Sequence, residues 1–237
     1  MKSPRTYEEL PFASELTGFP GSGFPGAGDS SGAGTDSLEI DGDYDRVLFS
    51  GALFADTDAG GARFTECAFT GAAGFDGGRL RRSRFSDVWF GESRLVAVDM
   101  AESSLTDVWF SGCVFAGVQA FSVLGRRVLL RGCKLDSVNF RDARLTDVVF
   151  EDCVLRDVDF GSGKLTRVRF PGSQLTGVDF SRVTCLSVDL RGARLGTSDT
   201  AGIKAGYDSL NGTWIDTPQL VTLAPLLAQH LGITVAD

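Results

Sequence analysis

Residues 133–160 read CKLDS-VNFRD-ARLTD-VVFED-CVLRD-VDF, and every fifth residue, from Leu135 to Phe160, is leucine or phenylalanine. The same five-residue step runs from Leu80 to Leu195, with weak members at Ala120 and Gly125. Two positions before these residues, valines recur at an unbroken spacing of ten from Val88 to Val188, and small residues alternate with them. Neither a helix nor a simple strand has this period. Two inward positions in each five-residue unit therefore predict a repetitive solenoid.

The length of one turn can be read from rarer residues. Cys113, Cys133 and Cys153 recur at intervals of 20, as do Trp89 and Trp109, which predicts four units per coil. In this frame the units resemble the pentapeptide-repeat family, whose pattern is A(D/N)LXX, over roughly residues 38–215. The resemblance implies an all-β fold, a right-handed parallel quadrilateral β-helix. About eight coils at the ~4.8 Å spacing of β-structure would give a rod roughly 38 Å long.

The frame breaks once. Phe75 follows Phe69 by six residues instead of five, so one residue is inserted within Gly71–Gly74. Glycines tolerate the backbone conformations of a bulge or a small corner loop, and we expect one of these here.

Both ends depart from the repeat. Residues 1–37 are predicted to be a flexible leader, because residues 18–34 are rich in glycine, proline and serine. Whether Tyr7–Phe12 folds back onto the first coil is left open. Residues 216–237 are predicted to be a helical cap or a dimerisation segment, with Thr217 as N-cap, Pro218 in the first turn, a kink or split at Pro225 and a stop at Gly232. Its apolar face consists of Leu220, Leu223, Leu227 and Leu231.

That leucine face has two interpretations. It could cover the open end of the solenoid, which terminal units of repeat proteins need for solubility. It could also form a homodimer, as C-terminal segments do in some members of the family. The two roles are compatible.

No residue pattern indicates an enzyme. The one histidine, His230, leaves no second position for a histidine-based triad. The three repeated cysteines occupy an inward position that other coils fill with serine or alanine, and a straight ladder cannot surround a metal ion. The letters GSGFPG at Gly21–Gly26 contain a proline and follow no strand, so they do not form a dinucleotide loop. We therefore predict no catalytic, cofactor-binding or metal-binding residues, and no cofactor.

The charge is unevenly distributed. Of the net charge of −8, residues 1–40 carry −4 (2 basic, 6 acidic), residues 41–200 carry −2 (20 basic, 22 acidic) and residues 201–237 carry −2 (1 basic, 3 acidic). No apolar run approaches the ~20 residues of a membrane helix, and the first residues lack a secretory signal. We expect a cytoplasmic protein with cysteines as free thiols, without membrane or direct nucleic-acid binding.

The outward residues predict two surfaces. One column of the coil reads Trp89, Trp109, Leu129, Val149, an apolar stripe that indicates a partner interface unless the N-terminal arm covers it. A second column forms an acidic strip with Asp159, Asp179 and Asp199. A third, with Arg144 and Lys164, is mildly basic and is interpreted as solvated.

The predicted function is a non-catalytic protein-interaction scaffold. The resemblance supplies an alternative, because some pentapeptide-repeat proteins resemble B-form DNA, bind DNA gyrase and confer quinolone resistance. A DNA-mimicking binder of gyrase or another topoisomerase, acting in fluoroquinolone resistance or self-protection, would match the rod shape and the acidic strip. The nearly neutral body weakens that alternative, because a mimic must present a duplex-like negative field.

Overall fold

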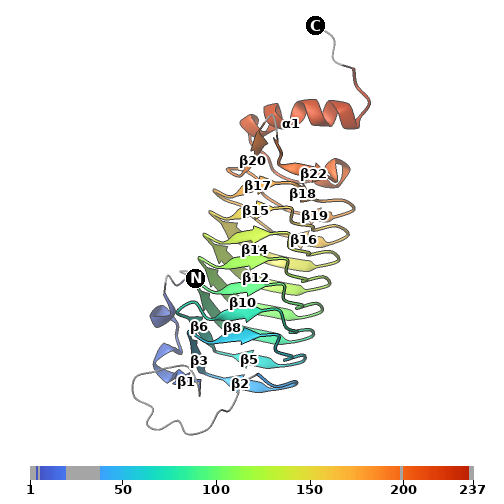
Figure 1. Ribbon diagram of the computed structural model, residues 1–237. Coiled ribbons are helices and arrows are strands. Elements are labelled where there is room, and N and C mark those ends of the chain that lie inside the picture. Colours follow the sequence, from blue (N-terminus) through green and yellow to red (C-terminus); the bar gives the residue numbers. More distant parts are fainter. Residues whose placement is uncertain (1–3, 5, 20–37, 198–199, 235–237) are drawn as a thin grey trace.

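The computed structural model describes residues 4, 6–19, 38–197 and 200–234 of the 237-residue chain. Figure 1 shows successive coils stacked into a rod, with the N-terminal elements beside its first coils and helix α1 (Thr217–His230) across its far end. All strand pairs between coils are parallel, and the predicted solenoid of about eight coils is confirmed.

Two long sheets run the length of the rod. The first has 11 strands: β1 (Thr17–Gly18), β2 (Asp43–Asp45), β3 (Val47–Ser50), β5 (Arg63–Thr65), β6 (Ala68–Thr70), β8 (Arg84–Gly91), β10 (Ser104–Ser111), β12 (Leu124–Arg131), β14 (Arg144–Glu151), β16 (Lys164–Thr166) and β19 (Thr184–Leu186). The second has nine: β4 (Leu53–Ala55), β7 (Gly74–Asp76), β9 (Arg94–Val96), β11 (Val114–Ala116), β13 (Lys134–Asp136), β15 (Val154–Arg156), β17 (Gln174–Thr176), β20 (Arg194–Thr197) and β21 (Thr200–Ala201). A short sheet pairs β18 (Val178–Asp179) with β22 (Ile203–Ala205).

The register confirms a coil of 20 residues. Trp89 pairs with Trp109, and Trp109 with Leu129. The coil has four sides. Two of them are formed by the first sheet, whose long strands β8, β10, β12 and β14 each turn a corner. The second sheet forms the third side, and isolated bridges from Asp58 to Asp179 form the fourth.

One left-handed residue makes each corner. From Arg82 to Gly192, every fifth residue has a φ between +50° and +76°. These residues lie two positions after the inward apolar residue, and Asp and Gly are the most frequent among them because they tolerate this conformation best. The corners therefore come from a position that the inward apolar pattern does not mark.

Phenylalanine and leucine fill the bore. Phe49, Phe69, Phe90 and Phe110 stack in successive coils, with ring centroids 4.4, 4.5 and 4.8 Å apart. The buried serines and cysteines of the second inward position donate to carbonyls of the preceding coil. Examples are Ser173 Oγ to the Phe150 oxygen at 2.8 Å and Cys153 Sγ to the Leu130 oxygen at 3.3 Å. In the described residues no buried side-chain nitrogen or oxygen lacks a partner.

The predicted insertion is confirmed. Phe54 pairs with Phe75, and Phe69 with Phe90, at a spacing of 21 instead of 20. The extra residue is accommodated by two successive left-handed residues, Gly71 and Ala72.

A second irregularity was not predicted. Strands β20 and β21 form an antiparallel pair, and the next coil resumes with Val178 opposite Ile203, 25 residues later. The coil is thus five residues longer than 20 at Val178, and the register then shifts by one residue, because Asp179 pairs with Ala205.

Helix α1 differs in detail from its prediction. Its N-cap is Asp216, not Thr217, and Asp216 and Gln219 form a capping box, with the Asp216 carboxylate accepting from the Gln219 N–H at 3.0 Å. An N-cap side chain accepts from the N–H three positions later, so Asp216 caps Gln219, whereas a cap at Thr217 would need the N–H of Leu220. The helix continues through Pro225, so the predicted split is wrong.

Candidate interaction surfaces

The tryptophan column consists of the stacked outward residues Leu48, Ala68, Trp89, Trp109, Leu129, Val149, Arg169, Asp189 and Trp214. Its first part is not exposed. Residues 6–19, here called the arm, pack Leu10 and Phe12 against Trp89, which is only 4% exposed. The prediction of an open stripe beginning at Trp89 is therefore wrong. The prediction of a leader that is flexible throughout residues 1–37 is also wrong, because the arm is ordered.

Backbone and side-chain bonds hold the arm in place. It contains the 3₁₀ helices η1 (Tyr7–Glu9) and η2 (Ala13–Glu15), followed by β1, which pairs with β3. Thr17 N–H donates to the Arg46 oxygen at 2.8 Å, and the Arg46 guanidinium binds Glu15 at 2.6 Å. The arm ends with Phe19, whose ring lies 4.8 Å from Phe49 at the start of the bore. It thus covers Trp89 and closes the first coil.

Beyond the arm, the column is partly open. Trp109, Leu129 and Val149 are half-buried, and Trp214 at the far end is 55% exposed. The Arg191 guanidinium lies 4.7 Å from the centre of the Trp214 ring. The apolar surface that was predicted as one stripe is therefore divided between a short middle section and the C-terminal end.

The acidic strip does not form as predicted. Asp159 lies 3.0 Å from the Arg141 guanidinium, and the Asp179 carboxylate accepts the Ser181 N–H at 2.7 Å. Asp199 lies outside the described residues, and Ala205 takes the position after Asp179 because of the β20–β21 hairpin. The strip is thus shortened, and its Asp159 is paired with a cation.

The leucine face of α1 is also divided. Leu223 is buried against the last coil and Leu227 packs beside it, whereas Leu220 and Leu231 are 50% and 69% exposed. The main polar anchor was not predicted: Gln219 is buried, and its amide donates to the Ala193 oxygen at 2.7 Å and to the Leu190 oxygen. A glutamine in a first helical turn gives no sequence signal of such a contact.

The cysteine thiols in the described part of the chain are buried or half-buried. Hydrogen bonding to the neighbouring Cys113 raises the pKa of Cys133 to about 12, and burial raises the pKa of Cys67 to about 12. Thiols with such pKa values are poor nucleophiles at neutral pH. In the described part of the chain no three acidic, cysteine or histidine side chains are grouped as metal ligands, and no helix is long and apolar enough to cross a membrane.

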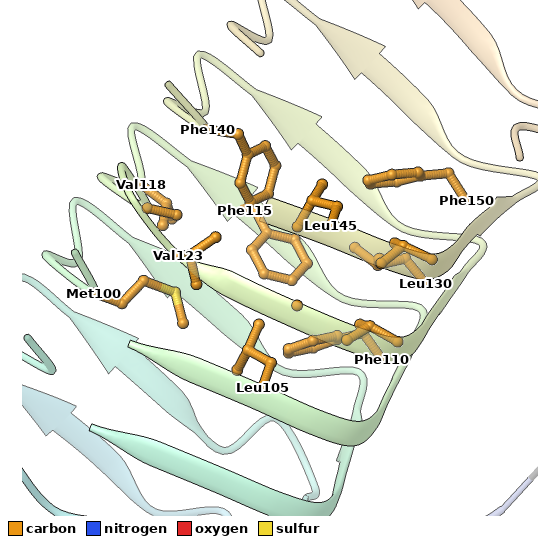
Figure 2. A pocket seen from close by; sticks show the side chains of 14 residues that line it. Met100, Leu105, Phe110, Phe115, Val118, Val123, Leu130, Phe140, Leu145 and Phe150 are labelled. Atoms are coloured by element: carbon orange, nitrogen blue, oxygen red, sulfur yellow. The ribbon is translucent and has the colours of Figure 1, made fainter. Parts of the chain in front are cut away.

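The bore contains a packing defect at Gly125. Gly125 stands where neighbouring coils carry leucine or phenylalanine, and Figure 2 shows the side chains that surround the resulting cavity, among them Leu105, Leu145 and Phe115. Its volume is about 30 Å³ and its walls are entirely apolar. A space this small and apolar is a gap between side chains, not a binding site for a substrate.

Comparison with known proteins agrees with this fold. A model described as a pentapeptide repeat region matches residues 126–199, and one described as pentapeptide repeats (8 copies) matches residues 48–87. The chain belongs to the pentapeptide-repeat family. No curated protein matches it.

Solved structures with pentapeptide-repeat folds are similar at low identity. A trypsin-treated form of QnrB1, a plasmid-mediated fluoroquinolone resistance protein, is 18% identical over 83% of this chain and 100% of its own, with a TM-score of 0.41. HetL from the cyanobacterium Nostoc sp. strain PCC 7120 is involved in heterocyst differentiation regulation. It is 16% identical over 74% of this chain and 90% of its own, with a TM-score of 0.39. A pentapeptide-repeat protein from the Arabidopsis thaliana thylakoid lumen is 21% identical over 46% of this chain and 72% of its own, with a TM-score of 0.36. Sequence identities and TM-scores this low give no evidence about the function of this chain.

Proposed function

We propose that this pentapeptide-repeat protein is a non-catalytic scaffold in the cytoplasm, and that its first partner is a second copy of itself. The observation that supports this most is the composition and exposure of α1. Residues 217–234 contain no Asp, Glu, Lys or Arg, and Leu220, Val221, Leu231 and Ile233 are each at least 50% exposed. Contiguous exposed apolar surface usually marks an interface.

The end of the coil enlarges this apolar surface. Trp214, 55% exposed, precedes the helix by three residues, and tryptophan is enriched at the centres of interfaces. At the other end Trp89 is covered by the arm and Trp109 is half-buried, so these tryptophans offer no comparable surface. We therefore place the interface at the C-terminal end, with α1 acting both as cap and as dimer contact.

The solution mass tests this proposal. We expect light scattering to give twice the chain mass of 25.2 kDa for the wild-type protein. Leu220→Glu combined with Leu231→Glu should give the single-chain mass, because it places charges on the exposed side of α1. The matched control is Ile40→Glu with Leu53→Glu, at two residues that are 63% and 64% exposed near the first coils. A wild-type protein that stays monomeric at about 100 µM would exclude a dimer of useful affinity.

The second candidate is a DNA-mimicking binder of gyrase or another topoisomerase that gives fluoroquinolone resistance or self-protection. Family membership and the rod shape support it, whereas the Arg141–Asp159 pair and the nearly neutral body weaken it. A supercoiling assay with purified gyrase, with and without a fluoroquinolone, tests it directly. An unchanged supercoiling rate and unchanged drug inhibition at micromolar protein would reject this candidate and leave the scaffold proposal standing.

A further inference from the structure

One side of the rod begins with the acidic strand β2, which places Asp43 and Asp45 next to Arg63 and Thr65, and beyond β2 its outward strand positions carry cations but no carboxylates. The basic face consists of the outward residues of β5, β16, β19 and the first halves of β8, β10, β12 and β14. From Arg63 to Leu186 these 14 positions hold five basic, seven hydroxyl-bearing and two leucine side chains, and no acidic one. The basic residues are Arg63, Arg84, Arg126, Arg144 and Lys164. From the sequence alone this face was interpreted as solvated, but the ion pairs of the folded chain favour a different interpretation.

These five cations have no ion-pair partner in the described residues, although most other arginines do. Two of the three aspartates at the adjoining corner, which carries Asp87, Asp107 and Asp147, are already engaged. Asp107 is bound by Arg127 in a two-bond contact. Asp147 is bound by Arg167 at 2.6 and 2.7 Å. Because of these pairs, Asp107 and Asp147 do not neutralise the cations of the basic face.

The clearest grouping of cations lies toward the C-terminal half. Arg144 and Lys164 are direct neighbours in the ladder, so their like charges stand one coil apart, an arrangement that is unfavourable without an anion. They line a hollow of about 830 Å³ together with the hydroxyls of Thr146, Thr166 and Ser162. A third cation reaches its rim, because Arg182 Nε donates to Ser162 Oγ at 3.2 Å.

One carboxylate, Asp142, also lines this hollow. Three cations and one carboxylate leave an excess of two positive charges around a set of hydroxyl donors. A phosphate group carries nearly two negative charges and three acceptor oxygens, which Arg, Lys and hydroxyl groups bind well. A carboxylate offers one charge and two oxygens and would leave donors unused.

We propose that this hollow is a binding site for a phosphate-bearing ligand, held by Arg144 and Lys164, with Arg182 at the rim and Thr146 and Thr166 as hydroxyl donors. The site lies on a different side of the rod from the tryptophan column and is independent of the C-terminal interface. A free oligophosphate and a phosphorylated protein segment share this chemistry, and the experiment separates them.

Calorimetric titration of the full-length protein at low ionic strength tests the site, with inorganic tripolyphosphate and a phosphoserine peptide as separate probes. We expect saturable binding of at least one probe. Tighter binding of tripolyphosphate identifies a free oligophosphate as the ligand, and tighter binding of the peptide identifies a phosphorylated protein. The double variant Arg144→Gln with Lys164→Gln should weaken binding about tenfold or more, since each lost charge-assisted bond is strong. Thr166→Val, which keeps the charge, should weaken binding about threefold by removing one donor.

The matched control is Arg94→Gln with Lys134→Gln. These two exposed cations of the opposite sheet also have no ion-pair partner in the described residues, and the variant changes the net charge equally. It should bind within twofold of wild type, and circular dichroism should show that both double variants are folded. Equal weakening by both double variants would overturn the site in favour of general charge attraction. Absence of saturable binding to both probes, or equally tight binding of an unphosphorylated glutamate-rich peptide, would also overturn it.

Discussion

The two ends of the rod are closed in different ways. At the N-terminal end the arm buries apolar side chains on an outer side of the coil, with Leu10 and Phe12 against Trp89, and adds Phe19 to the bore. At the C-terminal end α1 lies across the last coil with one fully buried leucine, Leu223, and a hydrogen-bonded glutamine. The first end conceals the apolar surface around Trp89, and the second leaves Trp214, Leu220 and Leu231 exposed. Closing an end of the bore and concealing the apolar surface around it are therefore separable in this solenoid.

The largest expected effect is at the arm. Leu10→Ala with Phe12→Ala removes two buried apolar side chains from the contact with Trp89, and truncations of this kind cost about 2–5 kcal/mol each in well-packed sites. We expect the arm to detach while the coil stays folded, since neighbouring coils hold each other independently of the arm.

Tryptophan emission measures this release. It should shift to longer wavelength and become more sensitive to acrylamide, because Trp89 and Trp109 become accessible. Ser14→Ala, at an exposed arm residue, is the control and should leave emission unchanged. Unchanged emission in the double variant would mean that the arm is held by its backbone pairing with β3 instead.

The next effect is at the opposite end and is polar. Gln219→Ala leaves the Leu190 and Ala193 oxygens without their donor and removes half of the capping box, a loss of about 2–3 kcal/mol. Urea unfolding should detect it, and hydrogen exchange should accelerate in α1 before the central coils. Gln229→Ala, exposed near the end of the same helix, should change neither measurement. Equal exchange in α1 and the central coils would show that the cap and coil unfold as one unit.

These ends were harder to predict than the coil. Inward residues such as Leu135 and Phe150 repeat with a fixed period, so burial alone specifies their position. Which outer column the arm would cover is decided by long-range packing of Leu10 and Phe12, and no period encodes it. The position of Ala205 beside Asp179 has the same origin, because the coil that contains the β20–β21 hairpin is longer than 20 residues by one five-residue unit, which preserves the sequence period but changes the spatial neighbour of Asp179.

The corners between the ends also differ in charge. Near the arm, Asp87 stands beside Asp107 and Glu66, and burial together with these charges raises its pKa. Farther along, hydrogen bonds from Arg167 lower the pKa of Asp147. The two carboxyls should therefore respond to pH with opposite signs.

Thermal unfolding between pH 3 and 7 tests this contrast. Asp87 ionises more readily in the unfolded chain, so it destabilises the fold above its unfolded pKa of about 4, and Asp87→Asn should raise Tm slightly at pH 7 but not at pH 3. Asp147 stabilises the fold above about pH 4 and loses this contribution as pH falls through its lower folded pKa, so Asp147→Asn should lower Tm slightly at pH 7. Shifts of the same sign for both variants would contradict this assignment.

The smallest expected effect concerns the bore between the two ends. The Gly125 backbone is not left-handed, and an added methyl group would point toward the 30 Å³ cavity, with its closest contact, 2.8 Å, to the flexible end of the Leu145 side chain. Gly125→Ala should therefore stabilise the protein by about 0.5–1 kcal/mol, through lower unfolded-chain entropy and a smaller gap. Gly117→Ala is the matched control, because Gly117 has open space around it but a φ of +64°, and this variant should destabilise by about 1 kcal/mol. Each coil contacts only its neighbours, so filling this gap should strengthen the coupling between the two halves of the rod. The two ends should then unfold at more similar urea concentrations. If Gly125→Ala lowers stability, Leu145 cannot move aside, and the cavity is a fixed feature of the packing between the ends.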